Sequence, residues 1–142
     1  MGVTFRRVHS PRLMEISYPQ DTDTLYEDWR RNECFLVAHE AGAVLAYLDM
    51  IVQKKEWQGW INHLIVGQSH RQQGIGTMLL KAAQRWARGS ELNAITVALQ
   101  SKNEPAIQFF SKQGYSFRGF VDHYYGDGDV RFIYTRFLAR SA

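Results

Sequence analysis

The segment from Trp57 to Arg88 constrains the fold most, because a β-type run is followed there by a loop and then at once by an amphipathic helix. Trp57 to Val66 is the β-type run. In the helix that follows, apolar residues recur at spacings of three and four, which is the helical period: Ile75, Met78, Leu79, Ala82, Ala83 and Trp86. Backbone N–H groups at a helix start lack internal partners and carry the positive end of the helix dipole. This order of elements therefore suits an anion.

The loop before the helix allows two interpretations. Its sequence is Arg71-Gln72-Gln73-Gly74-Ile75-Gly76-Thr77. Gly74 and Gly76 have no side chain to hold off a ligand, so a pyrophosphate can approach the main chain; the same loop could also be only a tight strand-to-helix connection. Two other phosphate loops are excluded. The loop has neither the three spaced glycines of the dinucleotide pattern nor the Gly-Lys-Ser/Thr of the nucleoside-triphosphate loop.

The rest of the chain alternates between strands and helices. Further strands are predicted over Val3 to Val8, Cys34 to His39, Ala43 to Val52, Ala94 to Leu99, Tyr115 to Val121 and Val130 to Leu138. A helix is predicted over Glu104 to Gln113, and one or two short helices between Ser10 and Asp28. We see no repeat or linker, so we expect one domain over residues 1–142, of the α/β (α+β) class.

Composition excludes several classes of protein. The net charge of +3 is mild and the basic residues are scattered, which does not favour nucleic-acid binding. No apolar run is long enough to span a membrane and no signal peptide is visible, so we expect a cytoplasmic protein. Cys34 is the only cysteine, and we expect it to be a buried strand residue. A single cysteine excludes an intrachain disulfide and a cysteine-based metal cluster, and we expect no metal.

Two motifs resemble those of the Gcn5-related N-acetyltransferases (GNAT). That family carries Arg/Gln-x-x-Gly-x-Gly/Ala after a strand that ends in Val, and here Val66 lies five residues before Arg71. The second motif is similar to the family's Asn-x-x-Ala-x-x-x-Tyr-x-x-x-Gly-Phe and runs from Asn103 to Tyr115. The resemblance covers roughly Val37 to Leu138.

The resemblance implies a mixed, mainly antiparallel central sheet of six to seven strands, flanked by about four helices. In such a fold the strands of Val66 and Leu99 splay apart and hold acetyl coenzyme A. The residues that would contact the cofactor are Leu64, Ile65, Val66, Arg71, Gln72, Gln73, Gly74, Ile75, Gly76, Thr77, Asn103 and Phe110. Asn103 is also a good helix cap whatever binds.

The implied activity is transfer of an acetyl group to an amine. The backbone N–H of Val66 would hold the oxyanion, but Phe110 replaces the tyrosine that usually protonates the thiolate. The positions used for a base on this strand fall on Trp60 and Asn62, and Asn62 could order a water. Alternation along the strand predicts that Asn62, Leu64 and Val66 share one face.

Other polar residues near this strand have two interpretations each. His63 titrates near neutral pH and is either a base or a hydrogen-bonded structural histidine. His70 would be a neighbour of the phosphates or a solvated residue. Asp49 and Glu56 are expected to be exposed at strand ends.

The acceptor is the least determined part. The tandem Tyr124-Tyr125 before the turn of residues 126–129 resembles the ribosomal-protein-alanine acetyltransferase branch, so Tyr124 is our candidate for the acceptor groove. The glutamate of those enzymes falls on Ala98, which makes a small-molecule amine an equal candidate. A non-catalytic sensor of acetyl-CoA is the alternative. The expected partners are acetyl-CoA and an amine, with no nucleic acid and no membrane, for a monomer or homodimer.

Overall fold

The computed structural model describes residues 4–7, 33–40, 43–53, 55–67, 74–124 and 126–139. Its strands are β1 (Thr4–Arg7), β2 (Glu33–Glu40), β3 (Ala43–Gln53), β4 (Gln58–Val66), β5 (Ala94–Gln100), β6 (Ser116–Val121) and β7 (Arg131–Phe137). Its helices are α3 (Ile75–Gly89) and α4 (Glu104–Lys112). The short helices expected between Ser10 and Asp28 lie outside the described residues.

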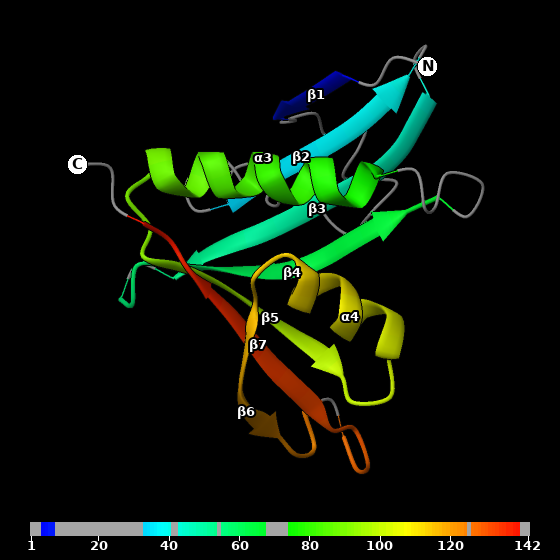
Figure 1. Ribbon diagram of the computed structural model, residues 1–142, viewed down its shortest axis with the longest axis vertical. Helices are drawn as coiled ribbons and strands as arrows, with labels where there is room; N and C mark the ends of the chain where they lie inside the picture. Colours follow the sequence, from blue (N-terminus) through cyan, green and yellow to red (C-terminus); the bar gives the residue numbers. More distant parts are fainter. Residues whose placement is uncertain are drawn as a thin grey trace.

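The strands form one sheet in the order β1-β2-β3-β4-β5-β7-β6. Every pair is antiparallel except β4 and β5, which run parallel. The prediction of a mixed, mainly antiparallel sheet is therefore confirmed. Figure 1 shows the consequence for shape: β1 to β4 form one half and β5, β7 and β6 the other, and the two halves diverge where β4 and β5 run apart.

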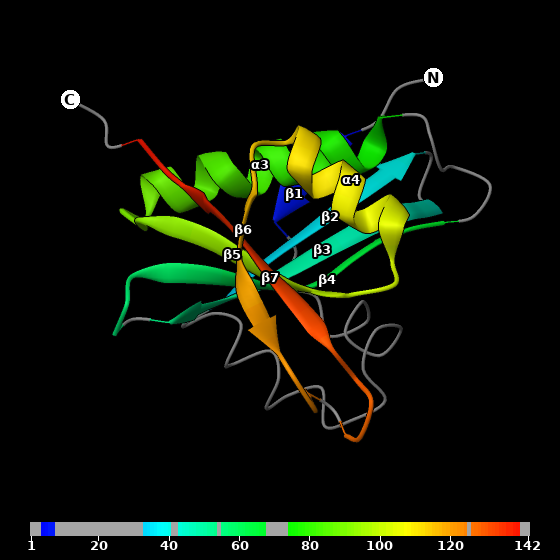
Figure 2. The same cartoon turned by 60° about the horizontal axis from the view of Figure 1, so that its bottom comes forward.

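Both described helices lie on the same side of the sheet, above it in Figure 2. Helix α3 buries its apolar stripe there, and one core cluster joins Leu79, Leu80 and Ala83 to inward-facing residues of β2 to β5 and β7. Full burial of one such leucine contributes about 1.5–3 kcal/mol. Neither helix is both long and apolar enough to cross a membrane.

The opposite face of the sheet carries a different set of side chains. Phe35, Asp49 and His63 are register partners across β2, β3 and β4, and none of them belongs to the α3 core cluster. Phe35 is 1% and Asp49 2% exposed. On this face Thr96 of β5 also pairs with Thr135 of β7, with their hydroxyl oxygens 2.8 Å apart. We call this surface the second face of the sheet.

Candidate functional site

The parallel contact between β4 and β5 is short. Only Gln58 to Ile61 pair with Ala94 to Val97, and within the described residues the remaining lengths of the two strands do not pair with each other. The expected splay is therefore present, and it opens at Ile61 and Val97 (Figure 1). Unpaired strand edges present N–H and C=O groups, so an extended polar chain can add to β4 at this point.

The N-terminus of α3 follows β4 along the chain. Gly74 caps it with φ 79°, a left-handed conformation that favours glycine, and no side chain caps the helix. The first turn contains no acidic residue. Its N–H groups therefore retain the character of an anion site. The expected phosphate neighbours Arg71, Gln72 and Gln73 lie outside the described residues, as does His70.

Gly76 has a different role from Gly74. A Cβ added at Gly74 would meet nothing within 4 Å, whereas one added at Gly76 would lie 3.5 Å from the ring of Phe109 and 3.8 Å from a methyl of Val66. The first turn of α3 therefore packs closely against β4 and α4 at Gly76, with room for a Cβ but not for a larger side chain. The Nε2 group of Gln113 donates to the hydroxyl of Thr77 at 3.3 Å and ties the same turn to α4.

A β-bulge interrupts β4 at the splay. The register pairs Asp49 with His63 but Met50 with Ile61, so Asn62 is the extra residue. Ile61 therefore joins Leu64 and Val66 in facing the α3 core. The prediction that Asn62 shares their face is wrong, because strict alternation holds only in a strand without a bulge. Asn62 is exposed.

Asp49 and His63 form a pair that the sequence analysis did not anticipate. The Nδ1 atom of His63 lies 2.8 Å from a carboxylate oxygen of Asp49. The prediction that Asp49 is exposed is wrong: its side chain is 3% exposed, against 42% for that of His63. The hydrogen bond and charge of Asp49 raise the pKa of His63 above 6.5, although partial burial opposes this. Glu56 is exposed, as predicted.

Aromatic residues lie on the same face as this pair. Tyr47 stacks on Phe35 with ring centroids 5.4 Å apart, and its ring lies 6.3 Å from that of His63. Trp60, the register partner of Thr96, has a buried indole Nε1 for which the described residues provide no hydrogen-bond partner. A buried donor of this kind costs about 1–3 kcal/mol unless a ligand or water meets it. The second face beside the splay is thus aromatic and contains an unsatisfied donor.

The second motif builds α4 and its cap. The side chain of Asn103 accepts a hydrogen bond from the backbone of Ala106 at 3.3 Å, so Asn103 is the helix cap. Phe110 is 4% exposed and packs edge-on against Phe109 and Tyr115. Contact of Phe110 with a cofactor arm stays a prediction. Cys34 is fully buried, as predicted.

The hairpin between β6 and β7 carries Tyr124. Its side chain is 39% exposed, and the guanidinium of Arg131 lies 5.8 Å from its ring centroid. Arg131 in turn forms an ion pair with Asp129 at 3.1 Å. These contacts fix Tyr124 against the base of the hairpin, and its contact with an acceptor stays a prediction. Tyr125 lies outside the described residues.

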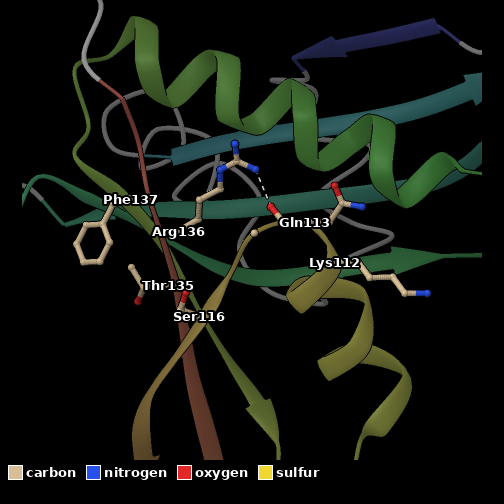
Figure 3. Close-up of a pocket in the computed structure, with 7 residues that line it drawn as sticks. Lys112, Gln113, Ser116, Thr135, Arg136 and Phe137 are labelled. Atoms are coloured by element: carbon tan, nitrogen blue, oxygen red, sulfur yellow. Dashed lines mark hydrogen bonds between the residues drawn. The ribbon is translucent and has the colours of Figure 1, made fainter.

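A cavity of about 450 Å³ lies at the sheet edge beside the C-terminal end of α4 (Figure 3). Lys112, Gln113, Gly114, Ser116, Thr135, Arg136 and Phe137 line it. Arg136 donates a hydrogen bond to the backbone carbonyl of Gln113 at 2.6 Å (Figure 3). None of the predicted site residues lines this cavity, so it is distinct from the splay. No group of three or more His, Cys, Asp or Glu that could hold a metal occurs in the described part of the chain.

Comparison with known proteins decides the family. The sequence model of the Acetyltransferase (GNAT) family matches residues 5–115. The chain belongs to this family. The match includes β1 to β5, α3 and α4, which are the elements that form the splay and both predicted motifs of this GNAT chain.

Proteins similar to this GNAT chain in sequence or in fold are named for different acceptors. It is 34% identical over 86 residues to N-alpha-acetyltransferase 60 of Drosophila melanogaster, which covers 56% of this chain but only 31% of that protein. The ribosomal-protein-S18-alanine N-acetyltransferase of Escherichia coli superposes with a TM-score of 0.80 at 14% identity, covering 99% of this chain and 97% of that one. An aminoglycoside 6'-N-acetyltransferase complexed with coenzyme A gives a TM-score of 0.78 at 13% identity, covering 98% and 99%. These two structures are similar in fold.

Proposed function

We propose that this chain is an acetyl-CoA-dependent N-acetyltransferase that transfers the acetyl group to a primary amine by direct attack on the thioester. One observation carries the proposal: the GNAT chain has its parallel β4–β5 pair interrupted after Ile61, with an uncapped helix N-terminus following β4. The acceptor is a small-molecule amine, a protein N-terminus or a lysine.

The residues fit coenzyme A. The pyrophosphate would meet the N–H groups of the turn from Gly74 to Thr77, with Arg71, Gln72 and Gln73 before it. The uncapped start of α3, with no acidic side chain in its first turn, supports this assignment. The pantetheine arm would add to the backbone of Leu64, Ile65 and Val66. Asn103 and Phe110 would flank it from α4, where Phe110 offers an apolar surface.

In this mechanism, transfer needs three contributions from the chain. The amine must lose a proton, the thioester oxygen must be stabilised as it gains negative charge, and the leaving thiolate must be tolerated or protonated. The backbone N–H of Val66 supplies the second. Asn62, exposed at the bulge, orders a water, and Tyr124 is the candidate hydroxyl for the acceptor or the thiolate, because Phe110 has none.

The similar proteins support an amine as the acceptor and do not distinguish a peptide from a small molecule. The fly relative is an N-alpha-acetyltransferase, and one structural neighbour acts on an aminoglycoside. Because this chain spans 31% of the fly protein, we keep both a peptide α-amine and a small-molecule amine as substrates. A cytoplasmic location and a monomeric or homodimeric state complete the proposal.

The direct test is release of free coenzyme A thiol. The purified chain is mixed with acetyl-CoA and, in separate reactions, a peptide with a free N-terminal alanine, a lysine-containing peptide with a blocked N-terminus, and an aminoglycoside. Acceptor-dependent thiol release with an acetylated product of matching mass is expected for at least one of them. Thiol release that never depends on an acceptor would contradict the proposal.

A non-catalytic sensor is the second candidate. Phe110 and Ala98 favour it, because they stand where the family and its peptide-acetylating branch keep a tyrosine and a glutamate. A sensor would bind acetyl-CoA and coenzyme A without turnover. Calorimetric binding of both ligands, together with no acetylated product from the three acceptors, would identify it.

A further inference from the structure

We propose that the His63–Asp49 pair on the second face of the sheet is the proton acceptor for the attacking amine, with Asp49 as the residue that positions the imidazole. This inference rests on the proposed function and identifies a base for it. Neither of the positions that the family uses on this strand, Trp60 and Asn62, supplies a titratable side chain here.

The acceptor must reach the β4–β5 splay from one side of the sheet. Both described helices and the core cluster fill the α3 side of the sheet, and the helix N-terminus that suits the cofactor phosphates is on that side. An arm that enters along β4 reaches the point where pairing with β5 begins, at Ile61 and Val97. On the second face the side chain of His63 is partly exposed at this point, so we place the acceptor there.

His63 lies next to the end of the β4–β5 pairing. The bulge at Asn62 shifts the alternation of β4 by one residue, so that His63 follows the end of the β4–β5 pairing and still faces Asp49 on β3. The splay and the only described buried carboxylate of β3 therefore meet at this residue. Its side chain is 42% exposed, which leaves access for a substrate.

The contact with Asp49 determines which nitrogen of the His63 imidazole carries the proton. Asp49 is buried and lies 2.8 Å from Nδ1 of His63, so the tautomer with Nδ1–H donates to the carboxylate and carries the lone pair on Nε2. The same carboxylate stabilises the imidazolium once a proton arrives. Tyr47 and Phe35 pack beside the pair and restrict the ring.

The proton balance is complete without another reactant. Nε2 of His63 takes one proton from the acceptor ammonium group, which frees the nitrogen lone pair. The C–N bond forms as the C–S bond of the thioester breaks, and the second nitrogen proton leaves with the thiolate sulfur as free thiol. The imidazolium then returns its proton to water, and the amide nitrogen keeps one hydrogen.

Asp49 is the charged group that acts on His63 in the described part of the chain. The neighbouring residues of β2 and β5 on this face are Phe35, Thr96 and Ala98, which carry no charge. Since Asp49 raises the pKa of His63, the neutral base accumulates only above a midpoint higher than pH 6.5. The rate should therefore rise with pH through that midpoint.

The test compares pH–rate profiles of four proteins: the parent, His63→Gln, Asp49→Asn and Asn62→Ala. The substrates are acetyl-CoA and whichever of the three acceptors above the parent acetylates. His63→Gln should lower kcat about 100-fold or more and abolish the acidic limb. Asp49→Asn should shift the limb to lower pH and lower kcat less. Asn62→Ala, which removes the water-ordering amide, should lower kcat but keep the acidic limb.

Two controls separate the outcomes. Acetyl-CoA affinity and melting temperature are measured for each variant, and Glu91→Gln, an exposed carboxylate at the far end of α3, serves as the matched charge control. If the parent releases no acceptor-dependent thiol, the proposed function fails. If the parent turns over and His63→Gln keeps both its rate and its acidic limb while remaining folded, the function stands and this inference is overturned.

Discussion

Ile61 of β4 and Val97 of β5 are the last register partners of the one parallel strand pair in this sheet. Beyond them β4 continues to Val66 and β5 to Gln100, and β5 keeps its other neighbour, β7, along its whole length. Beyond this point the facing edges of β4 and β5 both lose their partner strand. The cofactor assignment depends on this geometry, since these two edges open while each strand stays paired on its other side.

The first prediction concerns the start of α3. Gly76→Val should weaken coenzyme A binding at least about tenfold, because its methyl groups would displace Phe109 and Val66, which lie 3.5 and 3.8 Å from a Cβ at this position. Gly76→Ala should be tolerated, since those distances are ordinary contacts. Gly89→Val at the other end of α3 meets nothing within 4 Å and is the control. Calorimetry measures the affinities, and parent-like binding by folded Gly76→Val would refute the assignment.

The second prediction concerns alkaline stability. Burial raises the pKa of Tyr115 to about 12, although its hydrogen bond with Gln84 opposes this. Because the folded-state pKa lies above the unfolded value of 10, the stabilisation is complete below pH 10 and is lost between pH 10 and 12. The loss amounts to about 2–3 kcal/mol. Urea unfolding from pH 9 upward should show this slope in the parent and a reduced slope in Tyr115→Phe.

The same variant has an effect at neutral pH. The hydroxyl of Tyr115 accepts a hydrogen bond from the buried amide of Gln84 at 3.3 Å. Its removal should lower the free energy of unfolding by about 1–3 kcal/mol, because the amide loses a partner in the core. The double variant Tyr115→Phe with Gln84→Leu should recover part of that loss. Equal stability of parent and Tyr115→Phe would show that the bond contributes nothing.

Periodicity and motifs predicted much of this fold. The helical spacing predicted α3, and Ile75, Leu79 and Ala83 are buried as expected, whereas Met78 is exposed. Pro105 and Gly114 placed the limits of α4 within one or two residues. The resemblance supplied the splay between the strands of Val66 and Leu99, and the full strand order comes from the structure, since local patterns do not tell which strands pair. Sequence patterns work for α3 because it buries a single face against one core, whereas β2 is buried on both faces.

The bulge at Asn62 and the burial of Asp49 could not be predicted from the sequence, because both depend on contacts between strands. The bulge at Asn62 is a mismatch of one residue between β4 and β3, and it depends on the partner strand. The burial of Asp49 depends on His63, a partner 14 residues away that only the register brings within hydrogen-bond distance.

The third prediction concerns the missing hydroxyl of the second motif. Phe110→Tyr should raise turnover or leave it unchanged, because it adds an acid where the family keeps one. Phe110 is only 4% exposed and packs against Tyr115, so the melting temperature is measured together with kcat. A large fall in kcat with normal acetyl-CoA affinity and an unchanged melting temperature would mean that the site requires an apolar residue there.

The fourth prediction concerns the hairpin. Tyr124→Phe keeps the ring that lies against Arg131 and removes only the hydroxyl. We expect a lower kcat or a higher Michaelis constant for the acceptor, at unchanged affinity for acetyl-CoA. Arg131→Lys, which weakens the support of the ring and its ion pair with Asp129, separates loss of position from loss of the hydroxyl. If both acceptor constants of Tyr124→Phe match the parent, the hairpin is scaffold only.

Acceptor-dependent thiol release by the parent and by Gly76→Val tests directly whether acetyl transfer is catalysed at the β4–β5 splay. The parent should release one thiol for each acetylated amine, and Gly76→Val should require a higher acetyl-CoA concentration for the same rate. Tight binding of acetyl-CoA by the parent with no acetylated product from peptide, lysine or aminoglycoside would contradict catalysis at this splay.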